Sequence, residues 1–345
     1  MNASELEHEF DVDELRVQLP NEIKPTLEDN ALIQGLLPEK SVVSLIGPSN
    51  CGKSALALDL SAALATGKPF RNLRVQKCGV LYIACEGAHG LRNRVTALRI
   101  AGRLNGNAPL GLVTQAVDLC NSLTDPPRIV RACEALRAIG GDAVGLVVID
   151  TVARAMNGAD ENSGSDMGRF LANVESIRQQ TGATILLIHH AGKDMSKGAR
   201  GHSSFKAALD TEITVEGANN PRSVTVTKQR DLAPLEPFAF ELTPISVGSN
   251  KHGEEITAVV VEHSEKAVVK NTTRLGKNQT AALVALKERL NSNPDTNITT
   301  KELRELLARH SVRSRQRFHE VTQFLVDIHV LVKTIIGYRI DPESL

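Results

Sequence analysis

Short apolar runs alternate with segments of helical periodicity over the first two thirds of the chain. Five runs read as strands: residues 42–46, 80–84, 110–113, 144–149 and 184–188. Three segments carry apolar side chains at spacings of three and four, which predicts helices: residues 91–104, 128–139 and 166–180. Residues 54–65, which are rich in Ala and Leu, also predict a helix. Because strands and helices alternate, we expect an α/β fold whose parallel sheet is covered on both faces.

After position 210 the pattern changes to alternation of apolar and polar residues. Four segments show this period of two: residues 211–215, 223–227, 238–242 and 257–261. Alternation of this kind predicts antiparallel strands, which would extend the parallel sheet. We therefore expect an acidic N-terminal segment, residues 1–30, followed by a single large core over residues 31–262.

The C-terminal part of the chain predicts a second, smaller domain. A polar linker, residues 263–277, leads to a domain over residues 278–345. Its three predicted helices span residues 278–290, 300–310 and 314–327, and two short strands are expected between positions 330 and 340. Thr299 and Glu302 are spaced as in a capping box at the start of the second helix. This order predicts a winged helix-turn-helix domain.

That fold alone leaves two functions open, binding of DNA and binding of another protein. For DNA, the start of the third predicted helix would supply Arg313, Arg315 and Arg317, which could meet a major groove or phosphates.

Composition narrows the class of protein. The 345 residues have a net charge of zero, but residues 1–30 carry nine acidic against two basic residues, and residues 266–340 carry fourteen basic against six acidic ones. Either run is also compatible with a solvated surface, although the basic end favours nucleic acid. The absence of Trp disfavours extensive base stacking. Five cysteines without a C-x-x-C pair, and no secretory or membrane-spanning run, predict a cytoplasmic protein with free thiols.

One segment fits the phosphate-loop pattern G-x-x-x-x-G-K-[ST] at every position. It consists of Gly47, Pro48, Ser49, Asn50, Cys51, Gly52, Lys53 and Ser54. It lies between a predicted strand and a predicted helix, as such a loop must. Backbone N–H groups would surround the phosphates of ATP, Lys53 would neutralise their charge and Ser54 would reach Mg²⁺. The alternatives are a chance match and a site for another anion.

Two carboxylates follow predicted strands and would lie near this loop. Asp150 ends the run 144–149, where a carboxylate can hold the water shell of Mg²⁺. Glu86, followed by Gly87, ends the run 80–84 and is our candidate for the base that orients the attacking water. The simpler interpretations are a strand-end cap for Asp150 and an exposed loop acid for Glu86.

Two histidines, His189 and His190, end the last strand of the predicted parallel series. One of them could sense the terminal phosphate, and the sequence does not say which; a structural role is the alternative. The following loop is cationic and rich in glycine, so we expect it to contact a single strand of nucleic acid. Its candidate residues are Lys193, Lys197 and Arg200.

Taken in order, these motifs resemble the RecA-like ATPases of the RepA-type replicative helicases and their phage and plasmid relatives. The resemblance covers roughly residues 30–262 and rests most on Glu86-Gly87 and on the His-His-x-Gly-Lys sequence at 189–193. It implies that Lys53 and Ser54 bind phosphate and Mg²⁺, that Asp150 is the second metal residue, that Glu86 is the catalytic base, and that His190 or His189 is the phosphate sensor. It also implies hexameric rings with ATP between subunits and DNA in the channel.

Two features depart from this family pattern. The family needs a cation that reaches the ATP site of the neighbouring subunit, and the sequence does not fix which residue supplies it. Lys228 and Arg230 are the best candidates, with Arg200 behind them. The basic C-terminal domain is the second departure, because the smallest relatives end after the ATPase core.

The sequence thus predicts an oligomeric, ATP-dependent DNA translocase or helicase, acting in plasmid or phage DNA replication. A nucleotide-switched DNA-binding regulator or loader with slow ATPase is the main alternative. A metabolic kinase is a third hypothesis, for which we find no acceptor pocket in the sequence. Translocation polarity, ring size and the choice between DNA and RNA stay open.

Overall fold

The computed structural model describes residues 30–191, 202–230, 232–233, 235–264, 277–293, 295–310, 312–327, 330–334 and 337–342. The described residues form two units, one within residues 30–264 and one within residues 277–342, because no core cluster contains residues of both. Three clusters of buried apolar side chains form the core: two lie in the first unit, and the third is made entirely by residues of the second.

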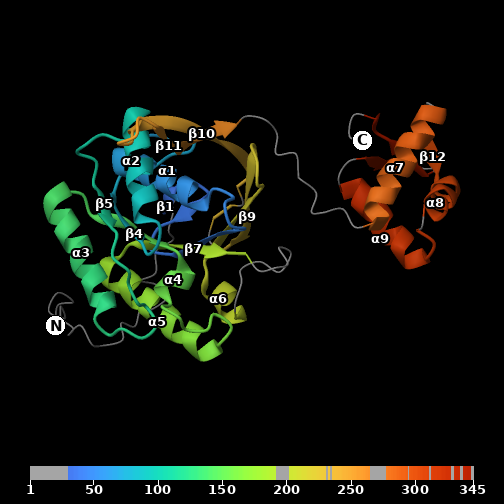
Figure 1. Cartoon of the computed structure of the whole chain (residues 1–345). Coiled ribbons are helices and arrows are strands. Elements are labelled where there is room, and N and C mark those ends of the chain that lie inside the picture. Colours follow the sequence, from blue (N-terminus) through green and yellow to red (C-terminus); the bar gives the residue numbers. More distant parts are fainter. Residues whose placement is uncertain are drawn as a thin grey trace, which may run out of the picture.

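A nine-stranded sheet runs through the first unit, in the order β11-β10-β9-β8-β3-β7-β6-β4-β5 (Figure 1). Six strands pair in parallel: β3 (Val42–Gly47), β4 (Gly79–Ala84), β5 (Leu110–Val113), β6 (Val144–Asp150), β7 (Thr184–His190) and β8 (Thr211–Glu216). Three antiparallel strands complete it: β9 (Arg222–Gln229), β10 (Phe238–Ser249) and β11 (Glu255–Ser264). A separate pair joins β1 (Ala31–Ile33) to β2 (Leu37–Pro38).

Both faces of the parallel part are covered. The helices of this unit are α1 (Lys53–Thr66), α2 (Ala88–Ile100), α3 (Asp125–Gly140), α4 (Val152–Ala155), α5 (Gly164–Thr181) and α6 (Ser203–Ala208). Successive residues of a strand point to opposite faces, so Val148 packs with residues of α1 and α2 whereas Ile149 packs with residues of α3 and α5. This double burial explains why the strands are continuous apolar runs.

The predicted elements of the core all occur. Their ends differ by at most four residues, except that β10 extends seven residues beyond its predicted end. Gly141 and Gly182, in left-handed backbone conformations, follow the last residues of α3 and α5, where glycine commonly ends a helix. One prediction needs correction: residues 211–215 were expected to begin the antiparallel part, but β8 lies parallel to β3 and only its other neighbour, β9, is antiparallel. Alternation of side chains fixes which face is buried, and it carries no information on the direction of the neighbouring strand.

The second unit contains α7 (Lys277–Ser292), β12 (Asn297–Thr299), α8 (Thr300–Arg309), α9 (Arg315–Asp327), β13 (Leu331–Lys333) and β14 (Gly337–Ile340). Its strands form an antiparallel sheet in the order β12-β14-β13. The predicted capping box is present, because the Thr299 side chain accepts from the Glu302 N–H and the Glu302 carboxylate accepts from the Thr299 N–H. Strand β12 was not predicted, since three residues are too few to show a period.

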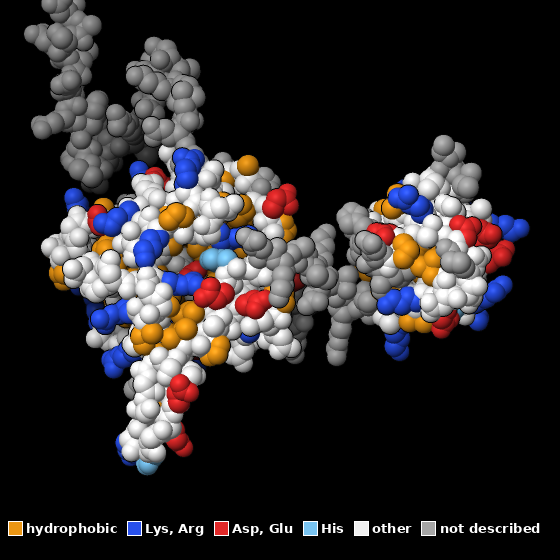
Figure 2. Space-filling model, turned by 90° about the horizontal axis from the view of Figure 1, so that it is seen from above, with side chains coloured by type: hydrophobic (Ala, Val, Ile, Leu, Met, Phe, Trp, Pro, Cys, Tyr) orange, Lys and Arg blue, Asp and Glu red, His pale blue; other side chains and the backbone are white. Residues whose placement is uncertain are grey.

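Three general features of the described residues concern surface charge, cysteines and helix hydrophobicity. Acidic and basic side chains are interspersed on the face shown in Figure 2. All five cysteines are free thiols, as predicted. Within the described ranges no helix has the length and apolar character needed to cross a membrane.

Gly47 is a position where a backbone contact requires glycine. A Cβ there would overlap the carbonyl oxygen of Val215 on β8 and lie 2.7 Å from the Sγ atom of Cys51. We expect Gly47→Ala to lower the free energy of unfolding by about 1–3 kcal/mol through overpacking. Gly106→Ala is the control, because its Cβ would meet no atom within 4 Å. Equal midpoints for both variants in urea denaturation would contradict this account.

Candidate functional site

The register of the parallel strands brings the predicted site residues to one edge of the sheet. Gly47 at the end of β3 pairs with His190 at the end of β7, and Asp150 at the end of β6 pairs with both Ile188 on β7 and Ala84 on β4. Glu86 follows β4 by two residues. The phosphate loop, both carboxylates and both histidines therefore belong to the same edge.

The phosphate loop is shaped by its backbone. Asn50 and Gly52 have positive φ angles of 64° and 95°, conformations that asparagine and glycine adopt more readily than other residues. Helix α1 then begins at Lys53 with no side-chain cap and no acidic residue in its first turn. Its first N–H groups are thus left for another partner, as at anion-binding helix ends.

Lys53 is only 6% exposed, and its ammonium lies inside the loop. Nζ donates hydrogen bonds to the carbonyl oxygens of Gly47 (2.9 Å) and Pro48 (2.7 Å). Burial lowers the pKa of Lys53, while the nearby Cys51 thiol and the carboxylates of Asp150 and Glu86 act in the opposite direction. A buried cation held mainly by neutral carbonyls would be stabilised by an anion such as a phosphate.

Asp150 is 6% exposed and has one oxygen without a partner. The Tyr82 hydroxyl donates to Oδ2 at 2.7 Å, whereas Oδ1 is buried and accepts no hydrogen bond. Burial raises the pKa of Asp150, and the hydroxyls of Tyr82 and Ser54 oppose this shift. A carboxylate oxygen and a serine hydroxyl are the hard ligands that Mg²⁺ prefers.

The donor set fits Mg²⁺ better than a metal held by protein alone. In the ranges that the structure covers, no three His, Cys, Asp or Glu side chains are grouped as a metal cluster. Mg²⁺ usually takes one or two protein ligands and completes its shell with phosphates and water. Ser54 and Asp150 could provide those protein ligands.

Glu86 lies at the rim of the site and has a partner that the sequence did not reveal. Its Oε2 accepts a hydrogen bond from Nε of Arg154, which follows β6 on α4, at 3.0 Å. The negative charge of this carboxylate acts to raise the pKa values of Lys53, Asp150 and His190, although burial is the largest influence on each. A base for an attacking water could act from this place.

The two histidines have different surroundings. His189 is fully buried, and its ring lies 4.9 Å from that of Phe205 on α6. His190 is half-buried, and its Nδ1 lies 3.5 Å from the Ser49 hydroxyl of the phosphate loop. Burial, aided by the charge of Lys53, lowers the pKa of His190. Of the two sensor candidates, His190 is the one beside the loop.

Lys228 and Arg230 make contacts within their own chain, at the C-terminal end of α6. Lys228 Nζ donates to the carbonyl oxygens of Lys206 (2.7 Å) and Leu209 (2.5 Å). Arg230 donates to the Ala207 carbonyl (2.8 Å) and to Asp210 (2.9 Å). Cations commonly stabilise the last carbonyls of a helix, so both side chains have a local role; a role at a neighbouring subunit stays a prediction.

The candidate nucleic-acid residues fall into two groups. Lys193, Lys197 and Arg200 lie outside the described residues. Arg315 and Arg317 are exposed at the start of α9, as the sequence predicted, and Arg313 is exposed two residues before this helix begins.

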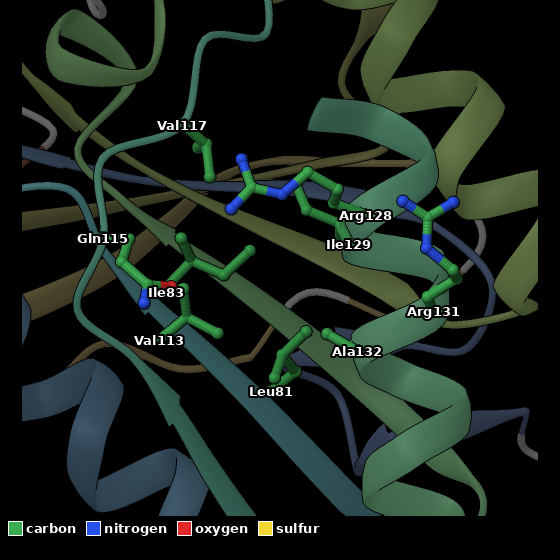
Figure 3. Close-up of a pocket in the computed structure, with 9 residues that line it drawn as sticks. All are labelled: Leu81, Ile83, Val113, Gln115, Val117, Arg128, Ile129, Arg131 and Ala132. Carbon is green, nitrogen blue, oxygen red and sulfur yellow. The ribbon is translucent and has the colours of Figure 1, made fainter. Parts of the chain in front are cut away.

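A separate cavity of about 420 Å³ lies between α3 and strands β4 and β5. Leu81, Ile83 and Ile129 are among the apolar side chains that line it, and Arg128 and Arg131 extend from α3 beside it (Figure 3). None of its lining residues belongs to the phosphate loop. We therefore do not include it in the candidate site.

Comparison with known proteins gives a family. A family model described as an AAA domain matches residues 8–196. Two solved structures are similar at 16% identity: a RadB recombinase (TM-score 0.41, covering 59% of this chain and 88% of that one) and a KaiC-like protein from Pyrococcus horikoshii OT3 (TM-score 0.42, covering 68% and 98%).

The environment of His190 predicts its titration. We expect its pKa to lie below the ordinary value of 6.5, as measured by NMR of the imidazole and assigned with His190→Gln. Because the unfolded chain then binds more protons, the contribution of His190 to stability is complete above pH 6.5 and decreases as the pH falls below it.

Lys53→Met tests the cause of the shift. Removing this charge should raise the pKa of His190, though not to its ordinary value, since burial is the larger cause. A wild-type midpoint at or above 6.5 would show that His190 is not held in this environment.

Proposed function

Because the chain belongs to the AAA domain family, whose model covers more than half of its length, we propose that it binds and hydrolyses ATP with Mg²⁺. Two groups at the same sheet edge carry the proposal. The buried Lys53 ammonium donates hydrogen bonds to neutral carbonyls of the loop, and a buried Asp150 oxygen has no hydrogen-bond partner. A Mg²⁺–triphosphate offers an anion to the first and a cation to the second.

Each residue of the site has a role in this proposal. Lys53 exchanges its carbonyl partners for phosphate oxygens, and the first N–H groups of α1 bind the same phosphates. Ser54 and Asp150 would hold Mg²⁺, which would neutralise charge on the transferred phosphoryl group. Glu86 orients the attacking water. His190, which lies beside Ser49 of the phosphate loop, senses the presence of the terminal phosphate.

We further propose that hydrolysis drives movement along DNA in a ring of subunits, as in the RepA-type helicases that the motif order resembles. Three features support this finer proposal. The motifs occur on β3, β4, β6 and β7 in the order that the resemblance requires, and the parallel sheet is extended by antiparallel strands. Cation candidates for DNA occur both after β7 and on α9. A hexamer is the expected assembly.

The C-terminal unit is proposed to be a winged helix-turn-helix domain that binds duplex DNA. Its order of elements, α7-β12-α8-α9-β13-β14, supports this assignment. The sheet of the first unit ends at Ser264 and α7 begins at Lys277, so we propose a linker between these positions. Three exposed arginines at the start of α9 could approach the phosphate backbone.

A nucleotide-switched regulator or loader with slow hydrolysis is a second candidate, and one observation favours it. Lys228 and Arg230, our candidates for the trans-acting cation, are both bonded to the end of α6 in the same chain. Without such a cation, hydrolysis would be slower by orders of magnitude. Strand displacement with DNA-stimulated hydrolysis favours the motor, whereas nucleotide-dependent DNA binding without displacement favours the regulator.

Two substitutions separate binding from chemistry. Lys53→Ala should abolish ATP binding and turnover, because the phosphates lose their buried cation. Glu86→Gln should keep the Kd for ATP within about twofold while lowering kcat by roughly a hundredfold or more, since it removes only the base. Isothermal titration and phosphate release measure these values. Full turnover in Glu86→Gln would remove Glu86 from the reaction.

The arginines of α9 predict a salt-dependent contribution to duplex binding. Replacing Arg313, Arg315 and Arg317 by Ala should weaken binding of duplex DNA and reduce the slope of log K against log salt by up to about 0.9 for each phosphate that is no longer neutralised. The control replaces three exposed arginines of α2 and α3, namely Arg99, Arg131 and Arg137, and so changes the net charge equally. Equal losses in both triple variants would argue against a specific surface on α9.

A further inference from the structure

Arg154 is bonded to the proposed base through a single contact, Nε to Oε2 of Glu86 at 3.0 Å. We propose that Arg154 is a positioning residue, which holds the Glu86 carboxylate in the orientation that aligns the attacking water. This inference rests on the proposed ATP hydrolysis and deepens it. Neither composition nor motif pointed to Arg154, because the two residues lie 68 positions apart in the chain.

The backbone beside Glu86 is held in place, whereas its side chain depends on Arg154 for its orientation. The N–H of Cys85 donates to the Asp150 carbonyl oxygen at 2.8 Å, which ties this corner to the end of β6. Beyond it, Gly87 has a φ of 69° and open space around it. The Glu86 side chain is 42% exposed and bonds only to Arg154 among the described residues. Without Arg154, nothing else there would fix its rotamer.

The Arg154 end is anchored equally well. Val152 and Ala155, the first and last residues of α4, are fully buried. The Ala155 carbonyl accepts from the Leu119 N–H at 2.7 Å, which holds this turn in place. Arg154 itself is 66% exposed and extends from the outer side of the turn to Glu86. One five-residue segment thus carries both the proposed metal carboxylate, Asp150, and the residue that orients the base.

The geometry of the contact suits orientation of a water molecule. The guanidinium binds Oε2 of Glu86 and leaves Oε1 to accept from water. In phosphoryl transfer the protein acts mainly by positioning and electrostatic stabilisation, so the orientation of this carboxylate matters as well as its basicity. The guanidinium group of Arg154 is planar and always charged, so it can hold a carboxylate in one orientation better than the flexible ammonium of a lysine can.

The small contribution of an exposed ion pair to stability lets an experiment distinguish a positioning role of Arg154 from a role in folding. An exposed ion pair contributes about 0–1 kcal/mol to stability, so replacement of Arg154 should leave the fold intact. The chain offers a matched pair at the opposite end of the strands, Lys77 with Asp142, at 2.8 Å and with 52% and 35% exposure. Lys77→Ala removes an ion pair of the same kind away from the site.

The experiment measures steady-state ATP hydrolysis by the full chain in Arg154→Ala, Arg154→Lys and Lys77→Ala. We expect Arg154→Ala to lower kcat roughly tenfold or more and to change KM for ATP by less than about twofold, because orientation and not binding is lost. Arg154→Lys should recover part of kcat, and Lys77→Ala should match the wild type. Thermal melting checks that all variants are folded.

A double variant then tests whether Arg154 acts through Glu86. In single-turnover measurements, Arg154→Ala should cost nothing further once Glu86→Gln is present. Independent, multiplicative losses would overturn the inference, as would an unchanged or raised kcat in Arg154→Ala, a rise in KM alone, or an equal loss in Lys77→Ala. If the wild type shows no ATP hydrolysis, or Glu86→Gln turns over normally, the proposed function fails instead.

Discussion

The parallel register of β3, β7, β6 and β4 is the constraint on which the whole site depends. Because parallel strands end at the same edge, pairing of Gly47 with His190 and of Asp150 with Ala84 brings together residues that lie far apart in the chain. Apolar side chains on both faces of these strands are buried under helices, which holds the strands inside the sheet. A slip by one residue would turn Asp150 toward the opposite face and separate it from the loop.

Two buried charged groups at this edge have an unfavourable electrostatic free energy, which a ligand of opposite charge can lower. Lys53 is a buried cation with neutral partners, and Asp150 is a buried carboxylate with an unpartnered oxygen. Both raise the free energy of the folded chain, and core packing on both faces of the sheet offsets this cost. Sites that bind charged ligands tightly often have this property, because the ligand supplies the missing partners.

Much of the first unit could be predicted because doubly buried strands leave continuous apolar runs, as at Val144–Asp150. Short elements such as α4 and α6 were missed, since four to six residues cannot show helical periodicity. The difference between His189 and His190 could have been inferred, because neighbouring strand residues face opposite sides. Contacts between distant segments, such as Glu86 with Arg154 or Lys228 with the end of α6, leave no sequence signal.

A structure of the full chain with Mg²⁺ and a non-hydrolysable ATP analogue tests the central claim most directly. The account predicts that Lys53 Nζ leaves the carbonyl oxygens of Gly47 and Pro48 for phosphate oxygens, and that Asp150 Oδ1 turns to the hydrated metal. A nucleotide bound elsewhere, with Lys53 still on its two carbonyls and Oδ1 still without a partner, would contradict it.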